Sequence, residues 1–293
     1  MDASLAVDRK LVRSRHLVPQ LSFKRIFLEW FALLNGMSRH IRAAWRGFLL
    51  LASLLFGALR FAATSLWQRL RGSRISPMQR AEWMHFCGRM VLAALGIRYR
   101  VEGTPPTGST LIAANHLSYL DIVIFSAALP AAFVAKHDIG SWPGFGQLAR
   151  MGGAIFVDRI SRVSAWETAE EMTQRLAARV PVVLFPEGTS TDGSSVLRFH
   201  SRLFEPVIVA QAPITPAAIR YVLSDGTPER ELCWFGDAGF LPHLWKTLGT
   251  AGFTAEVRFG DRRIYPHRRV AADQTYDEVV AMRAVDLVAQ EQI

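Results

Sequence analysis

Cysteine is scarce in this 293-residue chain, and the patterns that use cysteine for structure are missing. The two cysteines, Cys87 and Cys233, are far apart and lie outside any CxxC or Cys/His cluster. Their placement argues against a disulfide framework and against a structural zinc site. It suits a protein of a reducing compartment, and we expect no bound metal.

Two further patterns are missing. The first residues, MDASLAVDRKLVRSRH, have no apolar stretch close behind them, so we expect no ordinary secretory signal. No GxSxG turn follows a candidate strand, and neither cysteine sits in the context of a nucleophile. The chain therefore offers no obvious group for covalent catalysis.

Acidic residues are scarce in the first third of the chain. Residues 1–100 hold 17 Lys and Arg against 4 Asp and Glu, whereas the whole chain has 34 against 25. The excess positive charge therefore lies entirely in this region. A basic region of this kind binds either nucleic acid or an anionic membrane surface.

The apolar runs in the same region favour the membrane. Three segments have helical character: 21–37, 47–67 and 76–97, the last opened by Ser76 and Pro77 in the positions that cap a helix. The arginines border these apolar runs and do not interleave with a polar, aromatic face, so we expect no nucleic-acid partner. The alternative interpretation is a set of core helices in a basic soluble domain.

The central segment, GFLLLASLLFGALRFAATSLW at 47–67, is long enough to span a bilayer. However, Arg60 inside it would cost roughly 2.5–3.5 kcal/mol near the bilayer centre. Arginines also flank both ends, which gives no positive-inside asymmetry. We therefore predict an anchor that lies in the interface or inserts partly, with the flanking arginines among anionic headgroups.

From about residue 98 the pattern changes to alternating strands and helices. This alternation predicts an α/β domain at 98–293 with a mostly parallel sheet and flanking helices, preceded by a helical membrane-anchoring region at 1–97. The expected strands are 98–103, 109–115, 131–136, 152–159, 180–188, 213–222 and 253–260, with helices at 120–130 and 161–180. In such sheets the chemistry lies at the carboxyl ends of the strands.

The stretch NHLSYLD, residues 115–121, follows the apolar run TLIAA at such an end. Ser118 can cap a helix that begins at Tyr119, and Asp121 then completes a capping box. A carboxylate has about four acceptor sites, so Asp121 could also bind one ring nitrogen of His116 and leave the other free to take a proton. The alternative is that Asp121 only fixes a helix start and His116 is structural. If the pair is catalytic, the absence of a protein nucleophile favours proton abstraction from a substrate hydroxyl and direct acyl transfer from a thioester.

Two further segments end strands with polar groups. GGAIFVDRISR at 152–162 carries Arg159, whose guanidinium could bind a phosphate, or could form a surface pair with Asp158. VPVVLFPEGTSTDG at 180–193 continues through Glu187 into Gly188, Thr189 and Ser190, which could bind an anion through hydroxyl and N–H groups. Glu187 beside that anion would need a cation partner, for which Arg159 is the obvious candidate. The alternative is a simple turn.

In order and spacing these segments resemble the glycerolipid acyltransferases, which convert lysophosphatidic acid to phosphatidic acid, and related lysolipid acyltransferases. The resemblance covers about residues 98–285 and rests on four blocks: NHLSYLD, GAIFVDR, FPEGTS at 185–190 and APITPAAI at 212–219. The stretch VAKHDIGSWPGFGQLARMGG at 134–153 is also similar to the family, while STDGSSVLRFHSRLFEP at 190–206 looks like members that acylate lyso-ornithine lipid.

The resemblance implies a membrane-associated O-acyltransferase with lysophosphatidic acid as acceptor, or alternatively lyso-ornithine lipid. It implies His116 as general base, oriented by Asp121, with an acyl-CoA or acyl carrier protein thioester as co-substrate and no cofactor or metal. It places the enzyme on the inner (cytoplasmic) membrane, as a peripheral or monotopic protein with its site facing the cytoplasm. The residues implied to bind the substrates are Asn115, Lys136, Phe156, Arg159, Glu187, Gly188, Thr189 and Ser190.

Two functions of other classes remain open at this point. A non-catalytic lipid-binding scaffold would keep the anchor and transfer no acyl chain, which the intact His116 and Asp121 disfavour. A thioesterase or lipase-like hydrolase would release free fatty acid, which the missing nucleophile motif disfavours.

Overall fold

The computed structural model of the chain describes residues 38–142, 144–157, 162–223 and 225–290. The predicted helix at 21–37 and Arg159 lie outside these residues. Residues 38–293 form one compact unit. The boundary suggested at residues 97–98 therefore lies inside this unit, at the step from the third helix to the first strand.

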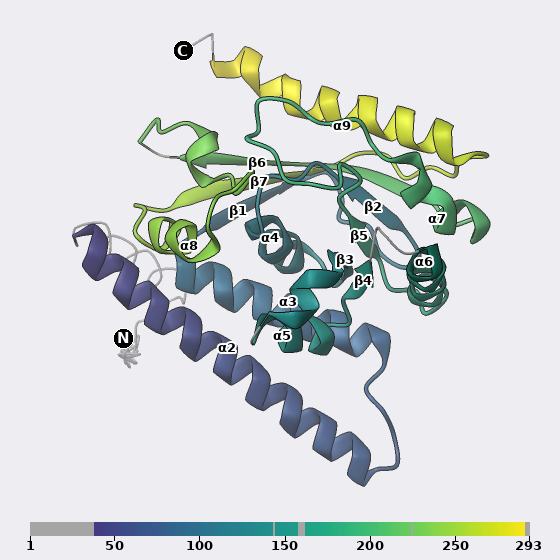
Figure 1. Cartoon of the computed structure of the whole chain (residues 1–293), viewed down its shortest axis with the longest axis horizontal. Coiled ribbons are helices and arrows are strands. Elements are labelled where there is room, and N and C mark those ends of the chain that lie inside the picture. Colours follow the sequence, from purple (N-terminus) through teal and green to yellow (C-terminus); the bar gives the residue numbers. More distant parts are fainter. Residues whose placement is uncertain (1–37, 143, 158–161, 224, 291–293) are drawn as a thin grey trace, which may run out of the picture. The chain divides into compact units, whose positions relative to one another are not determined.

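The core of the unit is a seven-stranded sheet whose strands lie at the seven predicted places (Figure 1). Their order is β1-β7-β6-β2-β5-β3-β4. Strands β6, β2, β5, β3 and β4 are mutually parallel, and β7 and β1 run in the opposite direction. The predicted mostly parallel α/β fold is thus confirmed. The strand bounds are β1 Arg98–Glu102, β2 Leu111–Ala114, β3 Ala132–Lys136, β4 Ile155–Val157, β5 Val182–Leu184, β6 Ile214–Leu223 and β7 Phe253–Phe259.

Helices cover both faces of the sheet, which explains why the central strands are apolar without alternation. On β2, Ile112 and Ala114 pack with α3 (Pro77–Leu95) and α4 (Leu120–Ala128). The intervening Leu111 and Ala113 pack with α6 (Arg162–Ala177), α7 (Glu205–Val209) and α9 (Arg268–Gln290). Figure 1 shows α9 and α4 on opposite sides of the sheet.

Helix α3 begins as its sequence predicts. The Ser76 hydroxyl accepts from Gln79 N, the Gln79 side chain accepts from Ser76 N, and Pro77 occupies the first turn. The helix ends at Gly96, whose φ of +68° favours glycine. Its buried face, including Leu92 and Leu95, joins the core beside α4.

Helix α2 (Arg39–Leu70) is longer than the predicted segment at 47–67, and its first turns are fixed to the protein. Arg42 donates to Gly249 O over 2.6 Å, and Arg46 donates to Thr250 O over 2.8 Å, just past α8 (Phe240–Leu248). Both guanidinium groups are buried. Burial, together with the charge of Arg42, lowers the pKa of Arg46 to about 10. The prediction that these two arginines lie among lipid headgroups is therefore wrong, because they bind backbone carbonyls instead.

Four α-helices among the described residues were not predicted from the sequence: α5 (Phe145–Met151), α7, α8 and α9. In α9 the residues that reach the core include the small Ala271 and Ala272 beside Val279. A buried face that combines these small alanines with the polar Thr275 gives a weak apolar periodicity. Helix α9 covers β6 and carries Arg283.

Candidate active site

The candidate site lies where β2 and β5 end side by side. Ala113 pairs with Leu184 in the parallel register, so the chain leaves both strands at the same edge of the sheet. Asn115 and His116 follow β2, and the loop from Phe185 to Ser190 follows β5. The fold therefore brings together two motifs that lie about 70 residues apart in the sequence.

His116 and Asp121 form the predicted pair. His116 Nδ1 lies 2.8 Å from Asp121 Oδ2. The same oxygen accepts from Leu117 N at 2.7 Å and from Ser118 N at 3.1 Å, while Ser118 Oγ accepts from Leu120 N. The helix begins at Leu120 with Tyr119 as its N-cap, so the prediction that Ser118 caps a helix from Tyr119 is wrong by one residue. Only half of the predicted capping box forms: Asp121 accepts from Ser118 N, whereas the Ser118 hydroxyl accepts from Leu120 N and not from Asp121 N. The predicted contact between Asp121 and the imidazole is confirmed.

The imidazole of His116 is held flat against the ring of Phe185. The two ring centroids are 4.2 Å apart and the planes are tilted by only 16°. The side chain of His116 is 20% exposed, whereas that of Asp121 is fully buried. Since Nδ1 faces Asp121, Nε2 is the ring nitrogen left for a reactant in the cavity that His116 lines.

Sequence reasoning missed the second side-chain partner of Asp121, which is Tyr221 on β6. Its hydroxyl donates a hydrogen bond to Asp121 Oδ1. Burial, followed by the neighbouring carboxylate charge, raises the pKa of Tyr221 far above its ordinary value, so this hydroxyl stays a donor. The carboxylate of Asp121 therefore receives four hydrogen bonds: from His116, Leu117, Ser118 and Tyr221.

Glu187 supports the backbone of the site and does not line the cavity. Its Oε1 accepts from His116 N at 2.7 Å, and its Oε2 accepts from Leu197 N at 2.8 Å. The side chain is buried, and this burial raises the pKa of Glu187 to about 7. The cation partner expected for it, Arg159, lies outside the described residues.

Asn115 also acts on the backbone. Its Nδ2 donates to Ile219 O at 3.1 Å, and its Oδ1 accepts from Ile219 N at 2.8 Å. The side chain is 1% exposed and reaches β6 rather than the cavity. It therefore ties the end of β2 to the neighbouring strand.

The other predicted binding residues separate into two groups. Gly188, Thr189, Ser190 and Lys136 line the same cavity as His116. Gly188 has φ +78°, the Ser190 hydroxyl donates to Trp234 O, and Lys136 pairs with Asp138 over 2.6 Å. Phe156 does not line this cavity and lies 5.4 Å from the guanidinium of Arg150.

The cavity has a volume of about 330 Å³ and mostly apolar walls. Among its lining residues are Ile122, Val134, Val157, Leu184, Leu203 and Trp234. Leu203 belongs to the stretch 190–206 that resembles the enzymes acting on lyso-ornithine lipid. Trp234 comes from a segment to which the sequence analysis assigned no role, and the fold brings it beside His116. An apolar chamber with one imidazole at its wall suits a reactant that is largely hydrocarbon.

No group of three or more His, Cys, Asp or Glu side chains able to hold a metal ion occurs in the part of the chain that the structure describes.

A model of the family described as Acyltransferase matches residues 97–220, which contain all four sequence blocks. The lyso-ornithine lipid O-acyltransferase of Rhizobium meliloti is 34% identical over 77% of this chain and 79% of its own length. The 1-acyl-sn-glycerol-3-phosphate acyltransferase of Neisseria meningitidis is also 34% identical, over 59% of this chain and 68% of its own.

Solved structures include one with the same fold, the 1-acyl-sn-glycerophosphate (LPA) acyltransferase PlsC from Thermotoga maritima. It aligns with a TM-score of 0.63 and 18% identity, and the match covers 83% of this chain and 93% of that one. The chain belongs to the acyltransferase family and is an acyltransferase enzyme.

Proposed function

We propose that the protein is a membrane-associated O-acyltransferase that moves a fatty acyl chain from a thioester to the free hydroxyl of a lysolipid. The observation that carries the proposal is the buried Asp121 carboxylate 2.8 Å from His116 Nδ1, with Nε2 left for the cavity. An imidazole held in this tautomer is a general base for a hydroxyl group.

In the proposed reaction, His116 Nε2 takes the proton of the acceptor hydroxyl. The resulting oxygen attacks the thioester carbonyl, a C–O bond forms, and the C–S bond breaks. The proton passes from the imidazolium to the departing sulfur, so the products are an ester and a free thiol. Asp121 stabilises the imidazolium between these two transfers.

The walls of the cavity support a role in holding the acyl chain next to His116, because apolar surface there would be removed from water by a hydrocarbon. Thr189, Ser190 and Lys136 at the same cavity support contacts to a polar headgroup. Arg159, by its place in the sequence after β4, is proposed to join them. The donor is proposed to be acyl-CoA or acyl carrier protein, with no cofactor.

The proposed acceptor is lysophosphatidic acid, giving phosphatidic acid in phospholipid biosynthesis. Lyso-ornithine lipid is the second candidate, and one observation favours it: the relatives from Rhizobium meliloti and Pseudomonas aeruginosa that carry this name match over 79% and 80% of their lengths. The apolar cavity walls fit either lipid, so the choice depends on the headgroup contacts.

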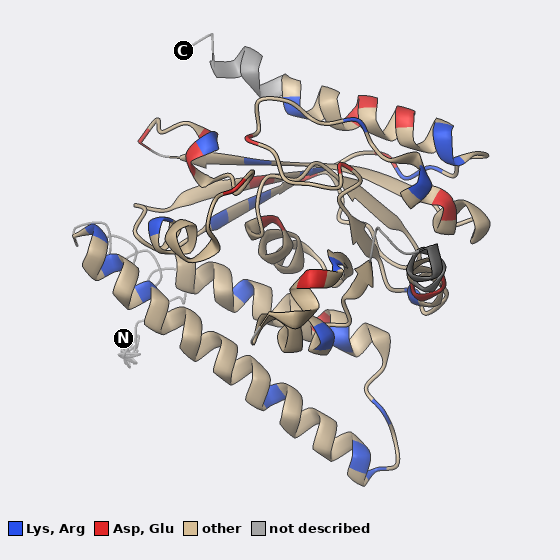
Figure 2. Ribbon diagram, in the orientation of Figure 1, with Lys and Arg blue, Asp and Glu red and all other residues tan. Residues whose placement is uncertain are grey.

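Helix α2 supports association with a membrane. It is long and apolar enough to cross one, and only 6% of its most apolar stretch of 18 residues is buried in the protein. It carries no acidic residue, and Figure 2 shows basic residues at both ends of the helix and another basic segment within its otherwise uncharged length, where Arg60 lies. Its exposed apolar side chains are Ile41, Phe48, Leu51, Leu55, Phe56, Leu59, Leu66, Trp67 and Leu70. We propose that this helix holds the enzyme at the inner membrane with its site toward the cytoplasm, where thioester donors are made.

The experiment is acyl transfer by purified protein in liposomes, with acyl-CoA and acyl carrier protein donors offered against lysophosphatidic acid, lyso-ornithine lipid and other lysolipids. Product from lysophosphatidic acid supports the first acceptor, and product from lyso-ornithine lipid alone supports the second. The absence of product with every pair would contradict the proposed function and favour a lipid-binding scaffold. Free fatty acid without an acceptor would indicate a hydrolase.

A further inference from the structure

Strand β6 extends beyond the end of its neighbour β2. The two strands pair up to Ala217 and Ala114, where β2 ends, and β6 then continues to Leu223. Beyond this point the edge of β6 that faced β2 has no strand partner, and its N–H and C=O groups must be satisfied in another way. Asn115 supplies one substitute through its two hydrogen bonds to Ile219.

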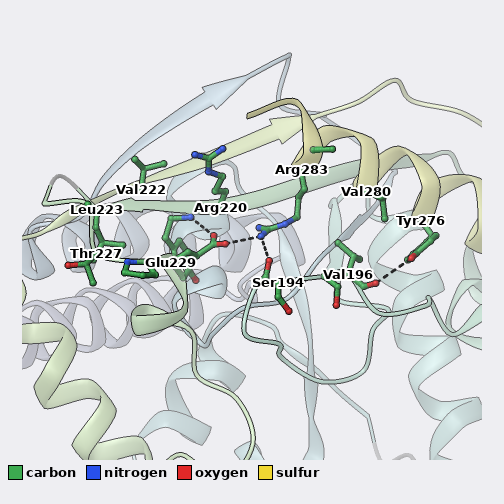
Figure 3. Close-up of a pocket in the computed structure, with 16 residues that line it drawn as sticks. Ser194, Val196, Arg220, Val222, Leu223, Thr227, Glu229, Tyr276, Val280 and Arg283 are labelled. Carbon is green, nitrogen blue, oxygen red and sulfur yellow. Dashed lines mark hydrogen bonds and ion pairs between the residues drawn. The ribbon is translucent and has the colours of Figure 1, made fainter. Parts of the chain in front are cut away.

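Glu229 and Arg283 satisfy further backbone groups on this edge of β6. Glu229 Oε1 accepts from Tyr221 N at 2.7 Å, and its Oε2 accepts from Arg283 Nη2 at 2.8 Å. Arg283 also donates to Ile219 O and, over 2.7 Å, to Gly193 O. Figure 3 shows this pair at the wall of a cavity of about 550 Å³ between β6 and α9. The two side chains therefore bind β6, α9 and the loop after FPEGTS to one another.

Tyr221 connects this pair to the catalytic residues. Its backbone N–H is held by Glu229, while its side chain packs in the core between the sheet and α3 and α4. From there the hydroxyl reaches Asp121 Oδ1, and Asp121 Oδ2 reaches His116. The chain of contacts from Arg283 to His116 is continuous.

We propose that Tyr221 is a positioning residue of the acyl-transfer reaction, and that Glu229 and Arg283 hold it in register against Asp121. The proposal rests on the function proposed for His116. None of the three residues lines the cavity that holds His116, so each acts through Asp121 and not on a substrate.

The physical reason is the burial of Asp121. A fully buried carboxylate is held in place by the donors that surround it, and without the Tyr221 hydroxyl Asp121 Oδ1 would be left without a partner in the core. The carboxylate would then be held less firmly against His116 Nδ1, which its other oxygen contacts.

The first test removes only the hydroxyl, with Tyr221→Phe. We expect kcat to fall roughly 10- to 100-fold, since a hydrogen bond to a charged group is lost, with KM nearly unchanged. The matched control is Tyr99→Phe, because the Tyr99 hydroxyl also makes a hydrogen bond, to Ala127 O, away from the site. It should keep the wild-type kcat and KM.

The second test addresses the supporting pair. Glu229→Gln and Arg283→Met should each lower kcat, and each should have little further effect when combined with Tyr221→Phe, because both act through the same hydroxyl. Wild-type kcat in Tyr221→Phe, or a loss that appears in KM and not in kcat, would overturn the proposal. If the fold-losses in kcat of the single variants multiplied in the double variants, the proposal would also be overturned.

A readout without turnover separates this proposal from the proposed function. The Nδ1 proton of His116 lies in a hydrogen bond to a carboxylate, and its NMR resonance reports that bond. In Tyr221→Phe this resonance should shift, and in Tyr99→Phe it should stay in place. A wild-type protein that transfers no acyl chain would contradict the proposed function alone, whereas an unchanged resonance in Tyr221→Phe would contradict the positioning role.

Discussion

The backbone N–H of His116 donates to Glu187 Oε1 across 2.7 Å, so the residue proposed as the base is held by a carboxylate from the loop after β5. The other oxygen of Glu187 binds Leu197 N, further along the same loop. One buried side chain therefore fixes the distance between two loops that lie at the ends of adjacent strands. The protonation of Glu187 should affect the stability of the fold, because its side chain is buried.

The raised pKa of Glu187 predicts that the free energy of unfolding depends on pH. Burial raises its pKa to about 7, above the ordinary 4.5, so between these values the folded protein holds a proton that the unfolded chain has lost. Stability should therefore fall as the pH rises from about 4.5 to about 7 and level off above, by about 3 kcal/mol in total. Urea unfolding of wild type and Glu187→Gln in detergent across this range measures the difference. A difference that stays constant with pH would contradict the assignment.

Asn115 should stabilise the fold rather than contact substrate. In Asn115→Ala, the N–H of Ile219 loses its partner inside the core, which should cost about 1–3 kcal/mol of unfolding free energy. Ser126→Ala is a suitable comparison, because the buried Ser126 hydroxyl bonds only Ile122 O within its own helix. We expect a smaller loss there. Equal losses in the two variants, measured by chemical denaturation, would argue against Asn115 as the link between β2 and β6.

The exposed apolar face of α2 should carry membrane binding. Leu55 and Leu59 are 62% and 61% exposed, and replacing both with Glu removes apolar surface worth about 1.5–3 kcal/mol per side chain when buried in lipid. Sedimentation with anionic liposomes should fall at least tenfold. Val209→Glu on α7 changes an equally exposed apolar residue and should bind as wild type. Undiminished binding of the Leu55/Leu59 variant would refute this role of α2.

Much of the fold could be predicted from the sequence, because strands covered on both faces give unbroken apolar runs and their polar ends are conspicuous. The His116–Asp121 contact was predictable for a local reason. The two residues lie only five apart across a strand-to-helix turn, so a carboxylate that bonds the backbone N–H groups of this turn also lies near the imidazole of His116.

Tyr221 could not be predicted in the same way. It lies 100 residues from Asp121 in the sequence, and only the pairing of β6 with β2 brings the two together. The same holds for Trp234 and Arg283. Arg42 and Arg46 show the converse difficulty, since their spacing beside an apolar run gives no sign of the carbonyl groups of residues 248–250 that bind them. The sequence shows where these arginines lie along the chain, but it does not show which backbone carbonyl groups they bind.

The role of His116 as general base is tested by the rate of acyl transfer by purified His116→Ala beside wild type, with membrane binding measured on the same samples. We expect the variant still to bind liposomes and its turnover to fall by about 10²- to 10⁴-fold, the usual contribution of a general base. Wild-type turnover in the variant would show that His116 is not the base.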